Sequence, residues 1–240
     1  MKLPVLAILA ASFTVPWSNR ARFFQALIIT LSILVVIDFV YSQVQQEGGV
    51  EFFLYILVNS IVYVCFAVTC HRLVLLGGDS VPRLGIFRWS QREFRFLLWG
   101  LKIGVVFFIL FMIILLSVYV VFDPEEELIT PILVIILAPF AYFLSRVILL
   151  FPSTAADKDY DLRWAYKLTE GNGFQMMAIV VLIPLTMTGI DELIKYLYGE
   201  GKIISLLMLA LAYIVTVFEI AAISLSYKYL TNKNVDWGET

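Results

Sequence analysis

The chain has 240 residues, 61% of them hydrophobic and only 15% charged, with a mean hydropathy of +0.92. A soluble domain carries about 45–50% apolar and about 25% charged residues, so a core of this size could not hide the apolar excess from water. These values exclude a water-soluble fold. The net charge of −2 also excludes the basic surplus that nucleic-acid binding requires.

The first twenty residues carry an apolar stretch behind Lys2 that resembles a signal peptide. Cleavage there would put the new N-terminus outside and reverse every loop against the distribution of cations described below. We therefore expect residues 1–20 to be retained as a cytoplasmic interfacial segment. It would form a short apolar helix bounded by Pro4 and Pro16, with Trp17 at the level of the lipid headgroups.

Six apolar runs follow, each close to the roughly 20 residues that a helix needs to cross about 30 Å of hydrocarbon. They cover residues 23–46, 52–70, 103–122, 128–145, 171–190 and 203–227, and only Asp38 and Glu219 interrupt them. Backbone polar groups in lipid must be satisfied within the spanning segment, and these runs are too long for barrel strands. The sequence predicts an all-α, polytopic membrane helix bundle, with a six-helix transmembrane domain over residues 21–240.

The lysines and arginines predict the orientation, because cytoplasmic loops retain positive charge. All of them except Lys195 and Lys202 fall on one side of the six spans. This side is therefore expected to be cytoplasmic and to hold both termini, and the acidic segment 123–127 is expected to face outward.

A short motif recurs at nearly constant spacing, beginning at Trp17, Trp89 and Trp164. Residues 71–76 and 145–150 also resemble each other at the ends of their spans. We interpret this pattern as three tandem hairpin units, residues 17–88, 89–163 and 164–240, with approximate threefold pseudosymmetry about the membrane normal. The alternative is that aromatic and cationic residues recur at membrane interfaces without any duplication.

The cytoplasmic segments are expected to lie on the membrane, including residues 81–89 and the apolar stripe of Tyr160, Trp164 and Leu168. Asn172 is expected to cap the helix that follows. The expected partners are the lipid bilayer, anionic lipid headgroups and a further membrane protein. The candidate interfacial anchors or headgroup contacts are Trp17, Arg20, His71, Arg72, Arg88, Trp89, Arg92, Arg163 and Trp164.

Glu219 is the strongest site candidate, because a charged group inside the membrane costs about 2.5–3.5 kcal/mol on insertion scales. It precedes Lys228 by nine residues, which is about 13 Å at 1.5 Å per residue. We expect an intramembrane ion pair with Arg146; the alternative is a proton or substrate relay. Asp38 lies near the outer end of its span and is expected to reach the interface with its side chain.

Catalytic chemistry has little support in the sequence, since the chain has one histidine, His71, and two cysteines, Cys65 and Cys70. The cysteines lie on different faces of one predicted helix, and no set of three or four metal ligands can be assembled. Phosphate-binding loops and nucleophile elbows are also absent from the sequence. We expect no enzyme activity, no cofactor and no metal.

Several runs together resemble an uncharacterised family of proteobacterial inner-membrane proteins over residues 68–174. They are HRLVLLG at 71–77, RWSQRE at 88–93, Ser145–Arg146 with Pro152, and AYKLTEGNG at 165–173, where Glu170 replaces the arginine usual in the family. The layout is also similar to the membrane region of some glycerophosphodiester phosphodiesterases. The resemblance implies a bacterial cytoplasmic membrane and supplies no activity.

By elimination, the composition favours a noncatalytic accessory or scaffold component of a membrane complex, or a lipid-contacting organiser. The alternative is a small transporter or channel with a polar pathway near Glu219 and the proline-containing helices.

Overall fold

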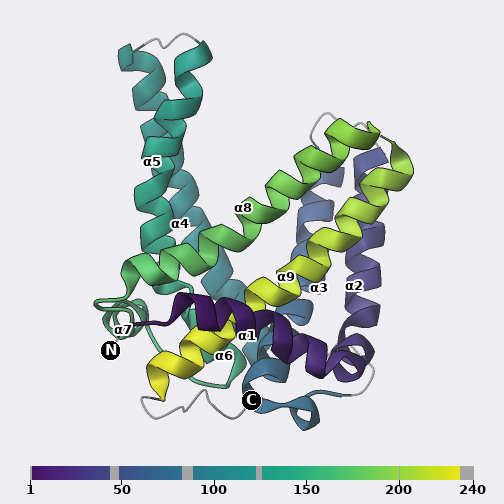
Figure 1. Cartoon of the computed structure of the whole chain (residues 1–240). Helices are drawn as coiled ribbons and strands as arrows, with labels where there is room; N and C mark the ends of the chain where they lie inside the picture. Colours follow the sequence, from purple (N-terminus) through teal and green to yellow (C-terminus); the bar gives the residue numbers. More distant parts are fainter. Residues whose placement is uncertain (1, 44–48, 83–88, 123–125, 200, 233–240) are drawn as a thin grey trace.

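The computed structural model describes residues 2–43, 49–82, 89–122, 126–199 and 201–232, with only the backbone described for 119–122 and 126–136. Every regular element within these ranges is helical (Figure 1). The helices are α1 (Val5–Ser18), α2 (Arg20–Gln43), α3 (Val50–Leu76), η1 (Gly78–Ser80), α4 (Gln91–Phe122), α5 (Glu126–Val147), α6 (Leu150–Ala155), α7 (Leu162–Leu168), α8 (Gly173–Tyr198) and α9 (Lys202–Thr231).

The expected all-α class is confirmed, and six helical segments are long and apolar enough to cross a membrane. Most of these helices extend past the apolar runs at one or both ends. Charged residues such as Arg20 and Lys228 belong to the terminal turns, where side chains can reach the interface. Length and composition are those of a multi-pass membrane protein.

Among the long helices, α2 packs against its chain neighbour α3, and α8 packs against its chain neighbour α9. Further contacts join α3 to α4, α5 to α8 and α9 to α2. The helix α9 also contacts α1, α3 and α6, and in Figure 1 it lies among α1, α2, α3 and α8. It therefore joins the early and late parts of the chain.

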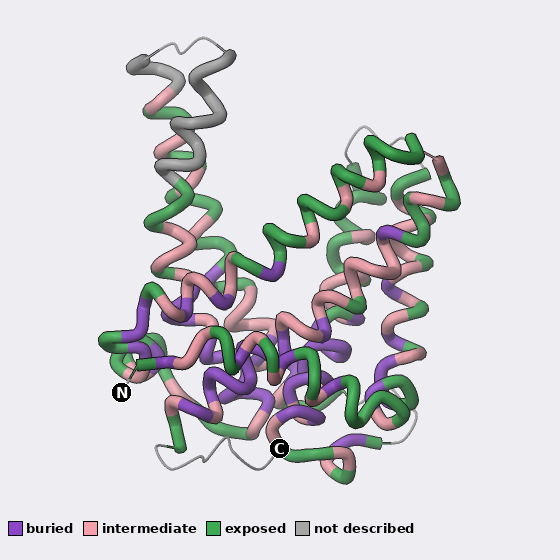
Figure 2. The backbone as a smooth tube through the Cα atoms, viewed as in Figure 1, coloured by how far each residue is buried: buried purple, intermediate pink, exposed green. Residues whose placement is uncertain are grey.

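The buried residues gather at the end of the bundle where both described ends of the chain lie (Figure 2). Phe66, Leu149, Leu150 and Met176 are among the largest fully buried side chains. Away from this end the helices are largely exposed: only 6% of the apolar window of α4 and 11% of that of α8 are buried. Such apolar surface is costly in water but ordinary in lipid.

The N-terminal helix α1 lies across this buried end of the bundle (Figure 1). Leu3 N donates a hydrogen bond of 2.7 Å to Asn172 Oδ1, and the Phe13 and Phe218 rings are 4.7 Å apart. Pro16 does not end the helix as expected, and α1 runs on to Ser18, because a proline near the end costs only one backbone hydrogen bond. Asn172 is the N-cap residue of α8, as expected, but its side chain makes no capping bond and accepts from Leu3 N instead.

Candidate functional site: a groove between α8 and α9

A groove of about 550 Å³ lies between α8 and α9. Asp191, Lys195 and Ser205 line it near the turn that joins the two helices, and Glu219 lines it at the opposite end. Ser205 and Glu219 are fourteen residues apart on one helix, so the groove extends about 21 Å along α9 at 1.5 Å per residue. This length is a large part of the roughly 30 Å hydrocarbon core of a bilayer.

The middle of the groove is lined by side chains that are either small or hydrogen-bonded to the backbone of their own helix. Ala212 offers only a methyl group, while Thr188 and Thr216 return their hydroxyls to carbonyls of their own helices. The Thr188 Oγ1 bond to Pro184 O is 3.1 Å long, and the Thr216 Oγ1 bond to Ala212 O is 2.9 Å long. Such bonds satisfy the hydroxyls locally, so they need no partner from the facing helix.

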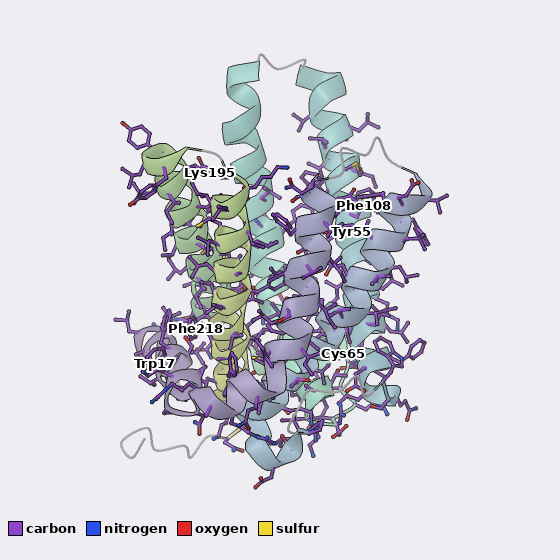
Figure 3. All side chains as sticks on the ribbon, turned by 90° about the vertical axis from the view of Figure 1, so that its right-hand side faces the viewer. Trp17, Tyr55, Cys65, Phe108, Lys195 and Phe218 are labelled. Carbon is purple, nitrogen blue, oxygen red and sulfur yellow. The ribbon has the colours of Figure 1, made fainter. Side chains whose placement is uncertain are left out.

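The end of the groove near the α8–α9 turn carries a local ion pair. Lys195 Nζ lies 2.6 Å from Asp191 Oδ2 and 3.9 Å from Glu192 Oε1, one helical turn away. In Figure 3 Lys195 stands toward one end of the bundle, and Trp17 and Phe218 stand toward the other. Lys195 is therefore engaged by carboxylates of its own helix, so this end of the groove carries no free positive charge from this pair.

Glu219 lies at the opposite end and does not form the expected ion pair with Arg146. The Arg146 guanidinium donates hydrogen bonds to Thr169 Oγ1 at 3.1 Å and to Tyr166 O at 2.6 Å, and it lies over the Tyr166 ring at 3.4 Å. These partners belong to α7 and its C-terminal end, against which α5 packs. The C-terminal carbonyls of a helix and an aromatic face both attract a cation. These contacts therefore account for the position of the Arg146 side chain.

The Glu219 carboxyl group has no hydrogen-bond or ion-pair partner within the described part of the chain. Its neighbour Phe218 stacks on Phe13 of α1, so α1 covers α9 next to this end of the groove. The arrangement is a groove with a mixed polar and apolar wall that leads to one unpaired carboxyl group.

The second intramembrane acid, Asp38, is not extended toward the interface as expected. Its Oδ1 accepts hydrogen bonds from Tyr55 Oη at 3.0 Å and Asn59 Nδ2 at 2.6 Å, and its Oδ2 accepts one from Tyr213 Oη. The three donors come from α3 and α9, so the carboxylate of α2 ties three helices together. A signal was present in the sequence, because Tyr55 and Asn59 are polar and one turn apart in an apolar span.

The candidate interfacial anchors divide into two groups. Trp17, Trp89 and Arg163 are exposed, Trp164 is half-buried, and the Arg20 guanidinium lies 5.8 Å from the Trp17 ring centroid. These side chains are at least partly exposed, so they can contact the membrane interface, as an anchor must. Arg88 and residues 83–88 as a whole lie outside the described residues.

The other group is occupied by contacts within the protein. His71 is buried, with Nδ1 2.7 Å from Ser224 Oγ, so it contacts no headgroup. Arg72 donates to Ala155 O at 2.9 Å and to Asp157 Oδ2 at 2.8 Å, and Arg92 donates to Asp157 Oδ1 at 3.0 Å. These residues fasten the segment after α6 to α3 and α4. These contacts give the three residues a structural role, and headgroup binding by Arg72 and Arg92 stays a prediction.

The two arginines also affect the acid that they share. Partial burial by itself raises the pKa of Asp157, but the hydrogen bond from Arg72 and the charges of Arg92 and Arg72 outweigh that effect. The pKa of Asp157 therefore lies below its usual value. The residue also has a φ of 61°, a left-handed conformation that aspartate tolerates better than most residues.

The six long apolar helices are those of a multi-pass membrane protein, and a groove lies between two of these candidate spanning helices. No family model matches the chain, and no curated protein or solved structure is significantly similar to it. The resemblance to a proteobacterial family therefore remains a prediction. Among the described residues, no group of three or more His, Cys, Asp or Glu side chains is placed to hold a metal ion.

Proposed function

We propose that the chain is a multi-pass protein of the bacterial cytoplasmic membrane with both termini in the cytoplasm. Arg22, Arg72 and Arg92 belong to the end of the bundle where both described ends of the chain lie, whereas Lys195 lies at the other end. This separation supports the orientation, because positive charge is retained on the cytoplasmic side. In this orientation α1 lies in the plane of the inner interface.

We also propose that the spans form three tandem hairpins. The second helix of each hairpin contacts the first helix of the next: α3 contacts α4, α5 contacts α8, and α9 contacts α2. Contacts between successive hairpins in this order agree with a threefold internal repeat. The contacts support the repeat units 17–88, 89–163 and 164–240.

The function that the geometry supports best is noncatalytic binding of a membrane-borne small molecule, in a lipid-contacting or accessory protein. The observation that carries this proposal is the groove between α8 and α9. Its volume of about 550 Å³ falls within the roughly 300–1,000 Å³ typical of small-molecule pockets. Polar groups stand at both ends and apolar side chains such as Met187 and Met208 between them, which suits an amphipathic molecule.

The test uses two variants of the protein extracted in native lipid discs. Ala212→Phe fills the middle of the groove, whereas the matched control Ile214→Phe adds a ring on the same helix at an exposed position outside it. Native mass spectrometry should detect a bound small molecule in the wild type and in Ile214→Phe but not in Ala212→Phe. Equal occupancy in both variants, or none in the wild type, would contradict the proposal. A protein subunit bound in constant stoichiometry would support the accessory role.

A second candidate is a small transporter, favoured by the length of the groove and by its asymmetry. The groove runs about 21 Å along α9 and ends near the contact between Phe218 and Phe13 of α1. A pathway open at the outer end and closed at the cytoplasmic end has this form. Thr216→Cys should then react with a membrane-impermeant maleimide added from outside. Failure of the reagent to reach this position, with Ser205→Cys labelled, would argue against transport.

A further inference from the structure

Glu219 has no partner for a charged carboxylate among the residues that the structure describes. An isolated charge in the hydrocarbon region costs about 2.5–3.5 kcal/mol or more, and within the described residues the carboxyl group has neither a hydrogen bond nor an ion pair. Nothing within the described ranges therefore balances its charge. Only a proton or another cation can balance it.

The groups that face Glu219 do not change this conclusion. From α3, Tyr63 lies close enough to interact with it electrostatically, and from α8 the nearest charges are Asp191 and Lys195, which pair with each other at the far end of the groove. The acid on α2, Asp38, is bound by three donors, and α1 has no ionisable side chain between Val5 and Ser18. The groove therefore keeps one net negative charge whenever Glu219 is ionised.

The dimensions of the groove point to a small ligand. Its volume of about 550 Å³ falls within the roughly 300–1,000 Å³ typical of small-molecule pockets. The side chains between the two polar ends include Met187, Met208 and Leu209. Methionine adapts its shape to irregular apolar ligands, so the middle of the groove suits an alkyl or aromatic chain.

We propose that Glu219 binds an amphipathic cation, an ammonium group joined to an apolar chain, in exchange for a proton. The neutral carboxylic acid releases its proton to water in the groove, and the resulting carboxylate pairs with the ammonium group while the chain lies along α8 and α9. Proton and ligand therefore compete for one carboxyl group. This inference rests on the proposed function, because it assumes that the groove is a binding site.

The ammonium group has two conceivable sources, an aminophospholipid headgroup and a free amphipathic amine. Glu219 lies about 13 Å from the cytoplasmic boundary marked by Lys228, which is deeper than headgroups normally lie, so the geometry favours the free amine. Competition experiments distinguish the two. Phosphatidylethanolamine added to phosphatidylglycerol discs should displace the ligand only if a headgroup reaches the site.

The decisive experiment is calorimetric titration of the protein in phosphatidylglycerol discs with decyltrimethylammonium, against decyl sulfate and decanol as matched probes, with empty discs subtracted. The probe cation has no proton of its own, so a proton released on binding must come from the protein. Comparing two buffers of different ionisation enthalpy measures this release. At a pH where Glu219 is protonated, about one proton should leave per bound cation, and the affinity should fall about tenfold per unit decrease in pH.

Glu219→Gln should weaken binding of the cation at least tenfold and abolish the proton release, while decanol binding stays unchanged and shows that the variant is folded. The control Glu192→Gln removes an exposed carboxylate near the other end of α8 and should change neither. Wild-type affinity and proton release in Glu219→Gln would overturn the inference and leave the groove as a neutral lipid site. If Ala212→Phe binds all three probes as the wild type does, the proposed function itself fails.

Discussion

Replacing Tyr213 by phenylalanine tests whether Asp38 holds α2, α3 and α9 together. The change removes only the hydroxyl that donates to Asp38 Oδ2, because the ring keeps its edge-on packing against Phe66 at 6.2 Å. Tyr55 and Asn59 remain as donors to the other carboxylate oxygen. The variant therefore leaves the carboxylate partly satisfied and the packing intact.

The expected loss follows from what is known of such bonds. A hydrogen bond to a charged group contributes about 1.5–3 kcal/mol in soluble proteins, whereas bonds between membrane helices contribute about 0.6 kcal/mol on average and at most about 1.7 kcal/mol. Because Asp38 Oδ2 accepts from Tyr213 alone among the described residues, we expect Tyr213→Phe to lower the free energy of unfolding by about 1–1.5 kcal/mol, toward the upper end of the membrane range.

The assay is reversible unfolding in mixed micelles, followed by circular dichroism, with a double-mutant cycle that combines Tyr213→Phe and Asp38→Ala. The control Tyr196→Phe removes a hydroxyl from a side chain that is 87% exposed, and a surface change of this kind should stay within about 0.5 kcal/mol. The reasoning is refuted if Tyr213→Phe is no more destabilising than the control, or if the cycle shows no coupling between Tyr213 and Asp38.

Three further predictions concern the end of the bundle where the buried core lies. Gly173→Ala should destabilise the protein by about 1–3 kcal/mol, because its Cβ would lie 2.5 Å from Tyr142 Oη; thermal melting checks this. Ser224→Ala removes the polar partner of buried His71 and should cost about 1–3 kcal/mol in the same assay. Asp157→Asn should remove a stabilisation that is complete above the unfolded pKa of about 3.9 and is lost as the pH falls through the lower folded pKa; melting between pH 3 and pH 7 measures it.

Each of these changes has a matched control. Gly104→Ala introduces a Cβ with nothing within 4 Å and should leave stability unchanged or raise it, since alanine favours the helix. Ser117→Ala removes an exposed hydroxyl bonded to its own helix and should be nearly neutral. Asp159 is more exposed than Asp157 and lies 3.6 Å from Arg95, so Asp159→Asn should alter the pH dependence less. Equal effects within any pair would contradict the corresponding prediction.

The sequence was sufficient for the helices and insufficient for their side-chain partners. Apolar runs predict spans because helix length must match the bilayer. Each of the six predicted runs overlaps one of the six candidate spanning segments of the structure. Depth along one helix, by contrast, does not reveal which neighbour faces a residue. Glu219 and Arg146 were expected to meet on that basis alone, yet Arg146 turns to the carbonyl of Tyr166.

The cationic segments show the same limit. The sequence pattern around an arginine is the same whether it binds a lipid headgroup or a group inside the protein. Arg72 and Arg92 could therefore not be distinguished from Arg163. Partners such as Asp157 come from segments far along the chain and are brought close only by helix packing. For Asp38, two of the three donors share one face of one predicted helix, so a search for polar pairs one turn apart would have found them.

The position of α9 has a consequence for how the protein is made. It packs against α1, α2, α3, α6 and α8, all of which precede it in the chain. A ribosome releases these earlier helices into the bilayer before their common partner exists, and until then Asp38 lacks the donor that Tyr213 provides. Until α9 is inserted, Asp38 of the nascent chain therefore lacks one of its three hydrogen-bond donors. Premature termination before α9 should yield chains that membrane proteases remove.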